Sequence, residues 1–324
     1  MAIARIEGSA FAIGQALGRL ANPAMHAHCL KSEAWRRLLQ WRSHPALVRL
    51  MAATQKYFPE YWQELEGLSD GLDMEFADVF LWNCRADLMP ESADPYCSVA
   101  ANRMQSRFIL HASEEDLSVP GSACFVEVRP HGKPGFVDMN IFGSLGGQRI
   151  AVNRAGVMLS VLANHSPGTD EAADKGESLP AAIVSRALLD TGSLEEAIDI
   201  VMQCPHFGNA HYFLASPKEF IMISIDCANG KKTLVPVANK HGRAGSGRWS
   251  ALLERIPNYP TDDDLIRLFL QQPERQEPRQ QQQARRRDSS PGVLAALRAD
   301  CRTVACQIIT SGGHRSETVI VDVT

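Results

Sequence analysis

The order of short apolar segments along the chain constrains its fold more than any single motif. From residue 97 to residue 163, short segments, several of them rich in Val, Ile and Phe, are separated by Gly, Pro and Asn. Such punctuation predicts a run of β-hairpins. Apolar residues at helical spacing precede this block in residues 11–85, and two further helices are expected after it, at Leu179–Leu189 and Leu194–Gln203. This grouping of strands and helices favours an α+β fold with antiparallel sheets over alternating βαβ units.

Local signals place the remaining elements. Ser193 and Glu196 form a capping box at the start of the Leu194–Gln203 helix. Residues 271–291 are rich in Gln, Arg and Pro and predict a disordered insertion, because such a composition cannot bury a core. The other expected elements are a strand at Ile3–Ile6, a helix at Phe11–Leu20, strands at Ala210–Ala215, Phe220–Asp226 and Thr233–Val237, helices at Ser246–Ile256 and Asp262–Gln271, and a final hairpin of Val304–Thr310 with Thr318–Val323.

Composition excludes several classes of protein. The 33 Lys and Arg residues against 37 Asp and Glu give a net charge of −4, which disfavours a general nucleic-acid surface. No apolar run approaches the roughly 20 residues that a membrane span needs, and the N-terminus makes a poor signal peptide, so the cytoplasm is the default location. The eight cysteines are scattered, as expected of reduced thiols in a reducing compartment. The sequence does not predict an oligomeric state.

Two motifs with possible ligand-binding roles are better interpreted structurally. The glycine-rich segment Phe142–Gly147 lacks the Lys-Ser/Thr of a phosphate-binding loop, which favours a turn between strands. His26, His28 and Cys29 have no further ligands nearby in the sequence, which disfavours a metal site. We therefore expect neither a cofactor nor a metal.

Cys97 is the strongest candidate for a catalytic residue. It opens the first strand of the β block directly after a loop, where a nucleophile can be both rigid and accessible, although a packing role is the alternative. If Cys97–Met104 and Arg107–Ala112 form a hairpin, Cys97 lies opposite Glu114, with Asp116 as the diagonal neighbour at about 7–8 Å. Asp116 could then orient an amine or a proton-shuttling group. Alternatively, Glu114 to Asp116 form a solvated acidic turn.

Several motifs in a fixed order resemble the acyl-coenzyme A:6-aminopenicillanic acid acyltransferase family of N-terminal nucleophile (Ntn) hydrolases. The resemblance covers most of the chain. The motifs that carry it are Glu7–Gly14 with Leu17-Gly18, Phe58–Tyr61, Glu64–Gly71, Asn83–Arg85, the Asn153–Val157 turn, Asn239–His241, Arg248 and the pair Cys301-Arg302.

The resemblance implies a four-layer αββα sandwich with two antiparallel sheets and a precursor that cuts itself before a nucleophilic cysteine. Here the cut would fall between Tyr96 and Cys97, separating an N-terminal mainly helical segment (residues 1–96) from a catalytic domain (residues 97–324). The released amine of Cys97, with a reference pKa of about 8, would activate its own thiol, with one of about 8.5. Asp116 would hold the amine and Arg248 would supply positive charge. Asn153, Asn239 and His241 would support the site.

The chain departs from the family pattern at three points. Tyr96 stands where the family usually has Gly, and Ser113–Asp116 stands where it often has Asn-x-Asp. Leu162 occupies the expected position of the asparagine that stabilises the oxyanion. Asn164 lies two residues further on, on the same strand face, and is our candidate for that role.

These residues predict an amidohydrolase or acyltransferase acting on a small-molecule amide or acyl thioester, with no nucleic acid or membrane as partner. One alternative is a member of the fold that binds an acyl ligand without turnover. The other is an uncleaved thiol hydrolase in which His111 serves as the base.

Overall fold

A computed structural model of the chain describes the first 89 residues almost completely and the rest in part. The described residues are 3–89, 97–102, 107–113, 123–163, 177–206, 210–216, 221–228, 231–236, 243–245, 293–299, 303–310 and 316–322. Side chains are described in 3–89, 123–161, 177–206, 210–216, 221, 223–227 and 231–236. The helices expected at Ser246–Ile256 and Asp262–Gln271, and the insertion at 271–291, lie outside the described residues.

The first 89 residues form a strand and a group of helices. β1 (Ala4–Gly8) leads into α1 (Ala10–Ala27), whose first turn is capped by the Ser9 hydroxyl, which accepts a hydrogen bond from the Ala12 amide at 3.3 Å. The helix runs past the expected end at Leu20 and contains Pro23. The following elements are the 3₁₀ helix η1 (Cys29–Lys31), α2 (Glu33–Leu38), the 3₁₀ helix η2 (Leu39–Trp41), α3 (Pro45–Tyr57), α4 (Pro59–Leu72), α5 (Phe76–Asn83) and α6 (Arg85–Leu88).

Helices α1 and α4 pack with their backbones in direct contact. A Cβ atom added at Gly14 would lie 1.8 Å from the Glu64 carbonyl oxygen, and one at Gly67 would lie 2.0 Å from the Phe11 carbonyl oxygen. Only glycine allows this approach, which explains two of the glycines in the motifs of the first third.

The larger sheet has eight strands in the order β1-β4-β5-β6-β7-β8-β9-β10. β1 pairs parallel with β4, with Ala4 opposite Val126, so the expectation of two antiparallel sheets is wrong for this sheet, which is mixed. Parallel pairing is possible because the long connection between β1 and β4 acts as a crossover. Its other strands are β4 (Ala123–Pro130), β5 (Phe136–Ile141), β6 (Ile150–Asn153), β7 (Met158–Ala163), β8 (Ala210–Ser216), β9 (Ile221–Ala228) and β10 (Lys231–Pro236).

The smaller sheet has six strands in the order β11-β2-β3-β12-β13-β14, and all of its pairs are antiparallel. It contains the predicted final hairpin and two strands, β11 and β12, that the sequence did not predict. The strands are β2 (Cys97–Asn102), β3 (Arg107–Ser113), β11 (Arg243–Gly245), β12 (Val293–Ala299), β13 (Thr303–Thr310) and β14 (Ser316–Asp322).

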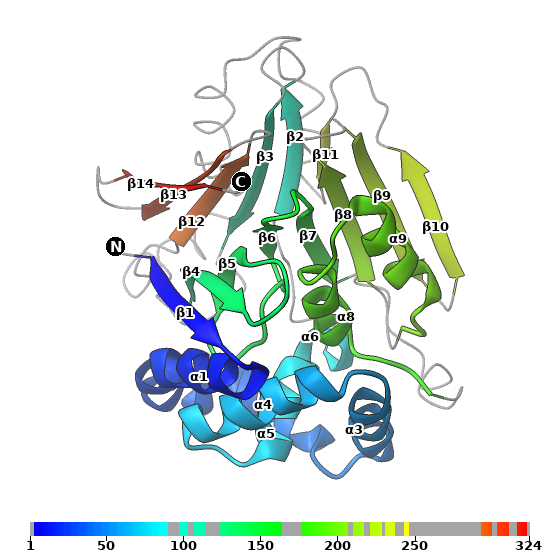
Figure 1. The fold of residues 1–324 in the computed structure, drawn as a ribbon. Helices are drawn as coiled ribbons and strands as arrows, with labels where there is room; N and C mark the ends of the chain where they lie inside the picture. The colour runs from blue at the N-terminus through cyan, green and yellow to red at the C-terminus, as the bar shows by residue number, and fades with distance from the viewer. Residues whose placement is uncertain are drawn as a thin grey trace, which may run out of the picture.

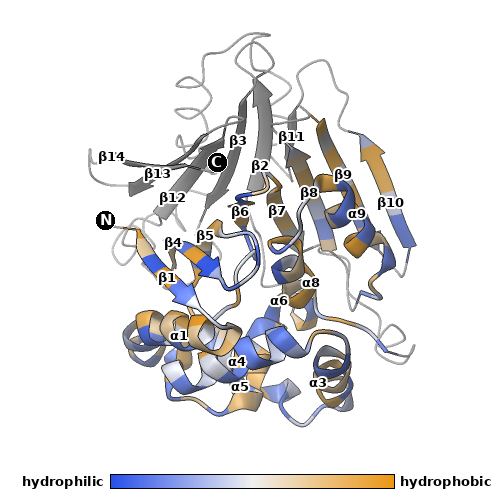
Figure 2. Cartoon of the chain, in the orientation of Figure 1, coloured by the Kyte–Doolittle hydropathy of each residue, from blue (hydrophilic) through white to orange (hydrophobic). Residues whose placement is uncertain are grey.

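Helices and strands together make the α+β architecture that the sequence predicted. The N-terminal helices gather at the base in Figure 1, while α8 (Ala181–Leu188) and α9 (Leu194–Gln203) lie beside β7 and β8. β2 of the smaller sheet lies against β7, and β3 against β6. Every residue of α8 is buried, and Figure 2 shows hydrophobic residues along this helix and the strands near it. Among the described residues, no helix has both the length and the apolar character to cross a lipid bilayer.

Candidate active site

Cys97 is the first residue of β2, as predicted, but its partner on the neighbouring strand differs from the expectation. It pairs with Ala112, whereas the predicted register placed it opposite Glu114. The difference of two residues arises because the strands end at the Asn102–Arg107 pair, so residues 103–106 form the connection instead of a tighter turn at 105 and 106. Asp116 consequently follows four residues after the partner of Cys97 and lies outside the described residues.

The strand on the other side of β2 leads toward Arg248. Gly245, the last residue of β11, pairs with Ser98, and β11 runs antiparallel to β2. The chain therefore leaves β11 on the side of Cys97, and Arg248 follows three residues later. Asn239 and His241 instead precede Arg243, which pairs with Ala100 further along β2. Arg248, Asn239, His241 and Tyr96 all lie outside the described residues.

The segments next to Asn164 and Asp116 lie at one end of the larger sheet. β7 ends at Ala163, immediately before Asn164, and the Val161 amide donates to the Arg149 carbonyl at 3.0 Å. Ala123, which the chain reaches from β3 through the connection that contains Asp116, pairs with Ile141 at the same end. Topology thus brings the segments before Asn164 and after Asp116 to one sheet end, although Asn164 itself lies outside the described residues.

The glycine-rich segment at this sheet end is a turn between β5 and β6, as predicted. Buried side chains form hydrogen bonds with its backbone. Asn83 is central to it: its Oδ1 accepts from the Leu145 amide at 2.9 Å, and its Nδ2 donates to the Gly143 carbonyl at 3.1 Å. Asp138 accepts from the Gly147 amide at 3.0 Å. Asn83, from the Asn83–Arg85 motif, therefore holds the loop of residues 142–148 in one conformation.

Arg85 lies against the same loop and was not singled out by the sequence as a site residue. Its Nη1 donates to the Trp82 carbonyl at 2.7 Å and to the Ser144 hydroxyl at 3.0 Å, and its Nη2 donates to Gln148 Oε1 at 3.2 Å. Burial, together with the nearby positive charge of Arg149, lowers the pKa of Arg85 to about 9. The only sequence signal was its membership in the Asn83–Arg85 motif.

Asp87 is a carboxylate near Arg85 but does not form an ion pair with it. Burial raises the pKa of Asp87 to about 8, while a hydrogen bond from the Ala181 amide lowers it. That amide lies 3.2 Å from Asp87 Oδ2 at the start of α8. At neutral pH, Asp87 is therefore largely protonated and neutralises little of the charge on Arg85.

Asn153, predicted to support the site, holds a turn in the larger sheet. Its Nδ2 donates to the Leu189 and Thr191 carbonyls at 3.2 and 2.8 Å, and its Oδ1 accepts from the Val157 amide at 2.8 Å. It thereby joins the β6–β7 turn to the end of α8. This turn precedes the strand that leads to Asn164.

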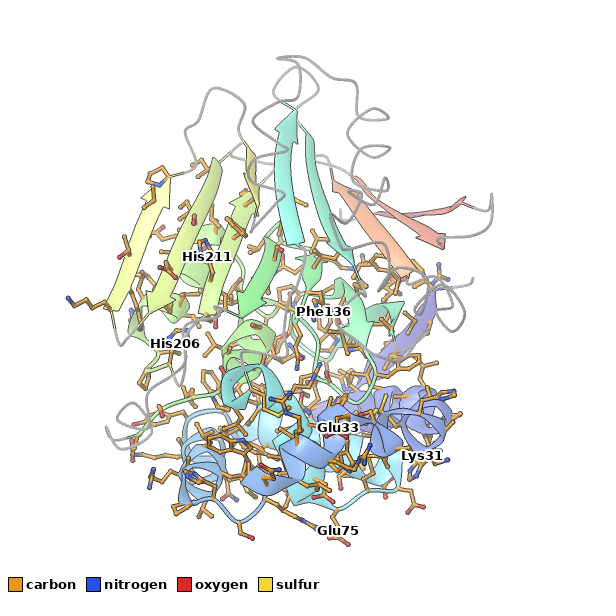
Figure 3. All side chains as sticks on the ribbon, turned by 180° about the vertical axis from the view of Figure 1, so that it is seen from behind. Lys31, Glu33, Glu75, Phe136, His206 and His211 are labelled. Carbon is orange, nitrogen blue, oxygen red and sulfur yellow. The ribbon has the colours of Figure 1, made fainter. Side chains whose placement is uncertain are left out.

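His26 and His211 each have a structural partner. His26 Nε2 lies 2.8 Å from the Leu72 carbonyl at the end of α4, and the described part of the chain holds no group of three or more metal-ligating side chains. His211, on β8 in Figure 3, contacts the Ser224 hydroxyl at 2.6 Å and lies 3.9 Å from Asp226. This arrangement is not a catalytic triad, because the distance to Asp226 exceeds a hydrogen bond and β9 is paired on both sides.

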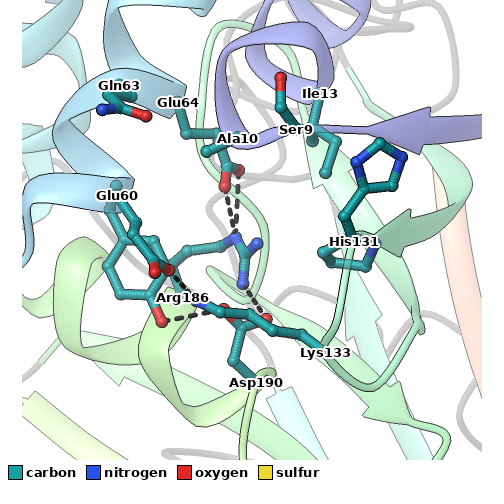
Figure 4. Close-up of a pocket in the computed structure, with 12 residues that line it drawn as sticks. Ser9, Ala10, Ile13, Glu60, Gln63, Glu64, His131, Lys133, Arg186 and Asp190 are labelled. Atoms are coloured by element: carbon teal, nitrogen blue, oxygen red, sulfur yellow. Dashed lines mark hydrogen bonds and ion pairs between the residues drawn. The ribbon is translucent and has the colours of Figure 1, made fainter.

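A second polar cluster lies between the N-terminal helices and the rest of the chain (Figure 4). Arg186 Nε donates to both oxygens of Glu64 at 3.0 Å, and its Nη1 donates to Asp190 at 2.7 Å. Lys133 also pairs with Asp190, at 2.9 Å. These groups border a cavity of about 240 Å³ that none of the predicted site residues lines.

The fold and this geometry define an α+β protein in which a cysteine begins a strand that lies between β3 and β11. Residues 99–240 match the family model of acyl-coenzyme A:6-aminopenicillanic acid acyltransferase, which confirms the resemblance that the motifs indicated. Over these residues the chain is therefore similar to this acyltransferase family. The matched region spans somewhat less than half of the chain; it includes Asp116, Asn153, Asn164 and Asn239 but neither Cys97 nor Arg248.

Among solved structures, the chain is similar to the Caenorhabditis elegans ortholog of N-acylethanolamine-hydrolyzing acid amidase. The similarity has a TM-score of 0.44 at 12% identity and covers 62% of this chain and 92% of the amidase chain. At this level it carries no argument about function. A search among curated proteins found no match.

Proposed function

We propose that the protein is an Ntn-type amidohydrolase or acyltransferase that cuts itself between Tyr96 and Cys97 and then uses Cys97 as its nucleophile. The observation that carries this proposal is the register of the smaller sheet. It puts Cys97 at a strand start, with Asp116 four residues beyond its partner on one side and Arg248 three residues beyond β11 on the other. The substrate would be a non-peptide amide or an acyl thioester.

The proposed reaction uses the two groups that scission would give to one residue. The α-amine of Cys97 accepts the proton of the thiol, since their reference pKa values are about 8 and 8.5. The sulfur attacks the acyl carbonyl, and the Asn164 amide stabilises the resulting oxyanion, an effect worth roughly 3–4 kcal/mol. The leaving group takes the proton from the amine, and an acyl thioester remains on Cys97. Water or a second amine then discharges this intermediate and regenerates the thiol.

Asp116 and Arg248 would assist without bonding to the acyl group. Asp116 would orient the amine of Cys97, and Arg248 would supply fixed positive charge. We also propose the four-layer αββα arrangement for the complete chain. It is supported by the packing of β2 on β7 and by the contact of α8 and α9 with β7 and β8.

Cleavage would divide the chain into residues 1–96 and 97–324, and we expect the two parts to stay together. β1 is hydrogen-bonded into the larger sheet beside β4, and Glu64 of α4 forms a buried ion pair with Arg186 of α8. Dissociation would expose both. The N-terminal segment therefore behaves as a structural chain of the mature protein and not as a removable pro-segment.

The two alternatives differ in what Cys97 needs. An uncleaved thiol hydrolase would use His111 as its base. His111 pairs with Ser98, the residue after Cys97, and successive strand residues alternate between the two faces of a sheet, so His111 and Cys97 lie on opposite faces. A non-catalytic binding protein is favoured by Tyr96 and Leu162, which replace residues that the family pattern expects.

Intact-mass measurement of the purified full-length protein tests the proposal. We expect the wild type to give masses for residues 1–96 and 97–324 that co-elute on gel filtration, and Cys97→Ala to give one uncut chain. Cys204→Ser is the matched thiol control, because Cys204 is half-buried at the end of α9, and it should be cut normally. An acyl-transferring activity-based probe should label only the fragment that starts at residue 97. An uncut wild-type chain whose Cys97 resists the probe would contradict the proposal.

A further inference from the structure

The cavity between the N-terminal helices and the rest of the chain offers hydrogen-bond donors that the described residues leave unused (Figure 4). Arg186 provides the most buried of them, since its side chain is only 2% exposed. Its Nε donates to Glu64 and its Nη1 to Asp190, whereas its Nη2 has no acceptor among the described residues. Because Arg186 lines the cavity, the two N–H groups of Nη2 are available to a molecule inside it.

Lys133 provides a second donor, from the turn between β4 and β5. Its ammonium group donates to Glu60 and, at 2.9 Å, to Asp190, which leaves one of its three N–H groups. The Glu60 side chain is 59% exposed, so water screens its ion pair with Lys133 and the pair contributes little. An anion in the cavity can therefore compete with Glu60 for Lys133.

The third set of donors belongs to the N-terminus of α1. Ser9 and Ala10 line the cavity. The Ser9 hydroxyl and carbonyl accept from the Ala12 and Ile13 amides, at 3.3 and 2.9 Å. The amides of Ala10 and Phe11 have no acceptor among the described residues, and the first turn contains no acidic residue. This end of the 18-residue helix carries partial positive charge, which favours an anion beside it.

The charges that line the cavity limit what this anion can be. Glu64 and Asp190 balance Arg186 and Lys133, so the buried part of the lining is close to neutral. The remaining donors can balance a single negative charge, but the two carboxylates would repel a doubly charged anion more strongly. At roughly 30 Å³ per water, a volume of about 240 Å³ holds about eight waters, which limits the ligand to a small molecule.

We propose that this cavity binds a small monocarboxylate, whose oxygens accept from Arg186 Nη2, Lys133 and the Ala10 amide. None of the described residues that line the cavity is a proposed catalytic residue, so this is a second site. It does not depend on the proposed function, and the uncut Cys97→Ala protein should bind the ligand as the wild type does. Because the lining comes from both the first 96 residues and the rest of the chain, a bound ligand adds contacts between them.

Ligand-observed NMR titration of the full-length protein at neutral pH tests the inference. Butyrate and butyramide have the same size but differ in a carboxylate against a neutral amide. We expect butyrate to bind at least about tenfold more tightly, because hydrogen bonds to charged groups are the stronger class. Inorganic phosphate, which carries more negative charge, should compete with butyrate only weakly. Absent butyrate binding, equal binding of butyrate and butyramide, or tighter binding of phosphate would overturn the inference.

Variants at two of the donors locate the bound carboxylate, since replacing Arg186 would also break its ion pairs. Ala10→Pro removes the amide at the first position of α1. Proline fits there, because Ser9 has the extended backbone (ψ 166°) that favours a following proline. Lys133→Met removes the ammonium group. Each change should weaken butyrate binding by at least about fivefold.

Two matched variants outside the cavity serve as controls. Glu33→Pro places proline at the first position of α2, and Lys56→Met removes a lysine that pairs with Glu177. Both should bind butyrate as the wild type does, and circular dichroism checks that every variant is folded. Butyrate binding that survives both Ala10→Pro and Lys133→Met would place the ligand elsewhere and overturn the inference.

Discussion

Two arginines, the buried Arg186 and the half-buried Arg85, show how different surroundings give the same side chain different roles. Arg186 is 2% exposed and meets two carboxylates, Glu64 and Asp190, with the Tyr61 and Phe136 rings beside it. Among the described residues, the hydrogen-bond acceptors of Arg85 are all neutral. Burial lowers the pKa of both, but the carboxylates reverse this for Arg186, whose pKa rises, whereas that of Arg85 falls to about 9.

Burial of an arginine therefore does not by itself indicate what the side chain does. A buried charge whose opposite charges are present joins parts of the structure, and Arg186 joins α4 to α8. A charge whose described hydrogen-bond partners are all neutral, as at Arg85, lacks that ion-pair stabilisation among the described residues. The predictions below test whether the two arginines differ in this way.

The largest effect is expected on breaking the Arg186 cluster. Arg186→Leu leaves Glu64 buried without its counter-charge and Asp190 with Lys133 alone, and it should lower the free energy of unfolding by about 3–5 kcal/mol. Urea unfolding followed by circular dichroism measures it. Lys56→Met, which breaks the exposed pair with Glu177, is the control and should change stability little. A comparably small loss for Arg186→Leu would remove the contrast between the two arginines.

Asp87 determines how much charge surrounds Arg85 at a given pH. Its folded-state pKa, about 8, lies above the unfolded value of about 3.9, so its contribution is most favourable below pH 4 and is lost as the pH rises toward 8. In Asp87→Asn this loss should disappear, which changes the pH slope of stability by up to about 1.4 kcal/mol per pH unit. Unfolding titrations from pH 5 to 8 compare the variant with wild type. Parallel curves for the two proteins would show that Asp87 is ionised throughout.

Replacing Arg85 itself should cost less than replacing Arg186. Arg85→Met removes three hydrogen bonds to neutral acceptors but also removes a charge that burial disfavours, so we expect a loss of about 1 kcal/mol. The same urea experiment measures it. If the loss equals that of Arg186→Leu, Arg85 has a counter-charge in the folded protein and the contrast between the two arginines disappears.

The smallest effect is expected at Ser144, which accepts one of the Arg85 hydrogen bonds. Ser144→Ala removes this hydrogen bond and should lower the free energy of unfolding by under about 1 kcal/mol. The same urea experiment measures it. A loss larger than that of Arg85→Met would mean that the Ser144 hydroxyl stabilises the loop through a contact other than the one to Arg85.

Elements with strong local signals were predictable. The Ser193 hydroxyl does accept from the Glu196 amide at 3.1 Å, and α9 spans the predicted Leu194–Gln203. By contrast, β12 has the sequence Val-Leu-Ala-Ala-Leu-Arg-Ala, which favours a helix by composition. It is a strand because β3 and β13 pair with it on both sides. Tertiary pairing here overrides local preference.

The candidate site was predictable only in part. The short apolar segments of the sequence predicted the start of a strand at Cys97. They did not predict its register, since a turn two residues longer moved the partner of Cys97 from Glu114 to Ala112. Arg85 and Arg186 show the same limit. Both are single arginines in helical segments, and apart from the Asn83–Arg85 motif nothing nearby in the sequence singles them out.

The sequence by itself determined the α+β class, most helix positions, the turn at Phe142–Gly147 and the family resemblance, because periodicity, caps and turn residues act within a few positions. Only the tertiary structure decided the parallel β1–β4 pair, the strand β12, the register around Cys97 and the charge balance at each arginine. These depend on contacts between residues such as Glu64 and Arg186, which lie far apart in the chain and meet only after folding.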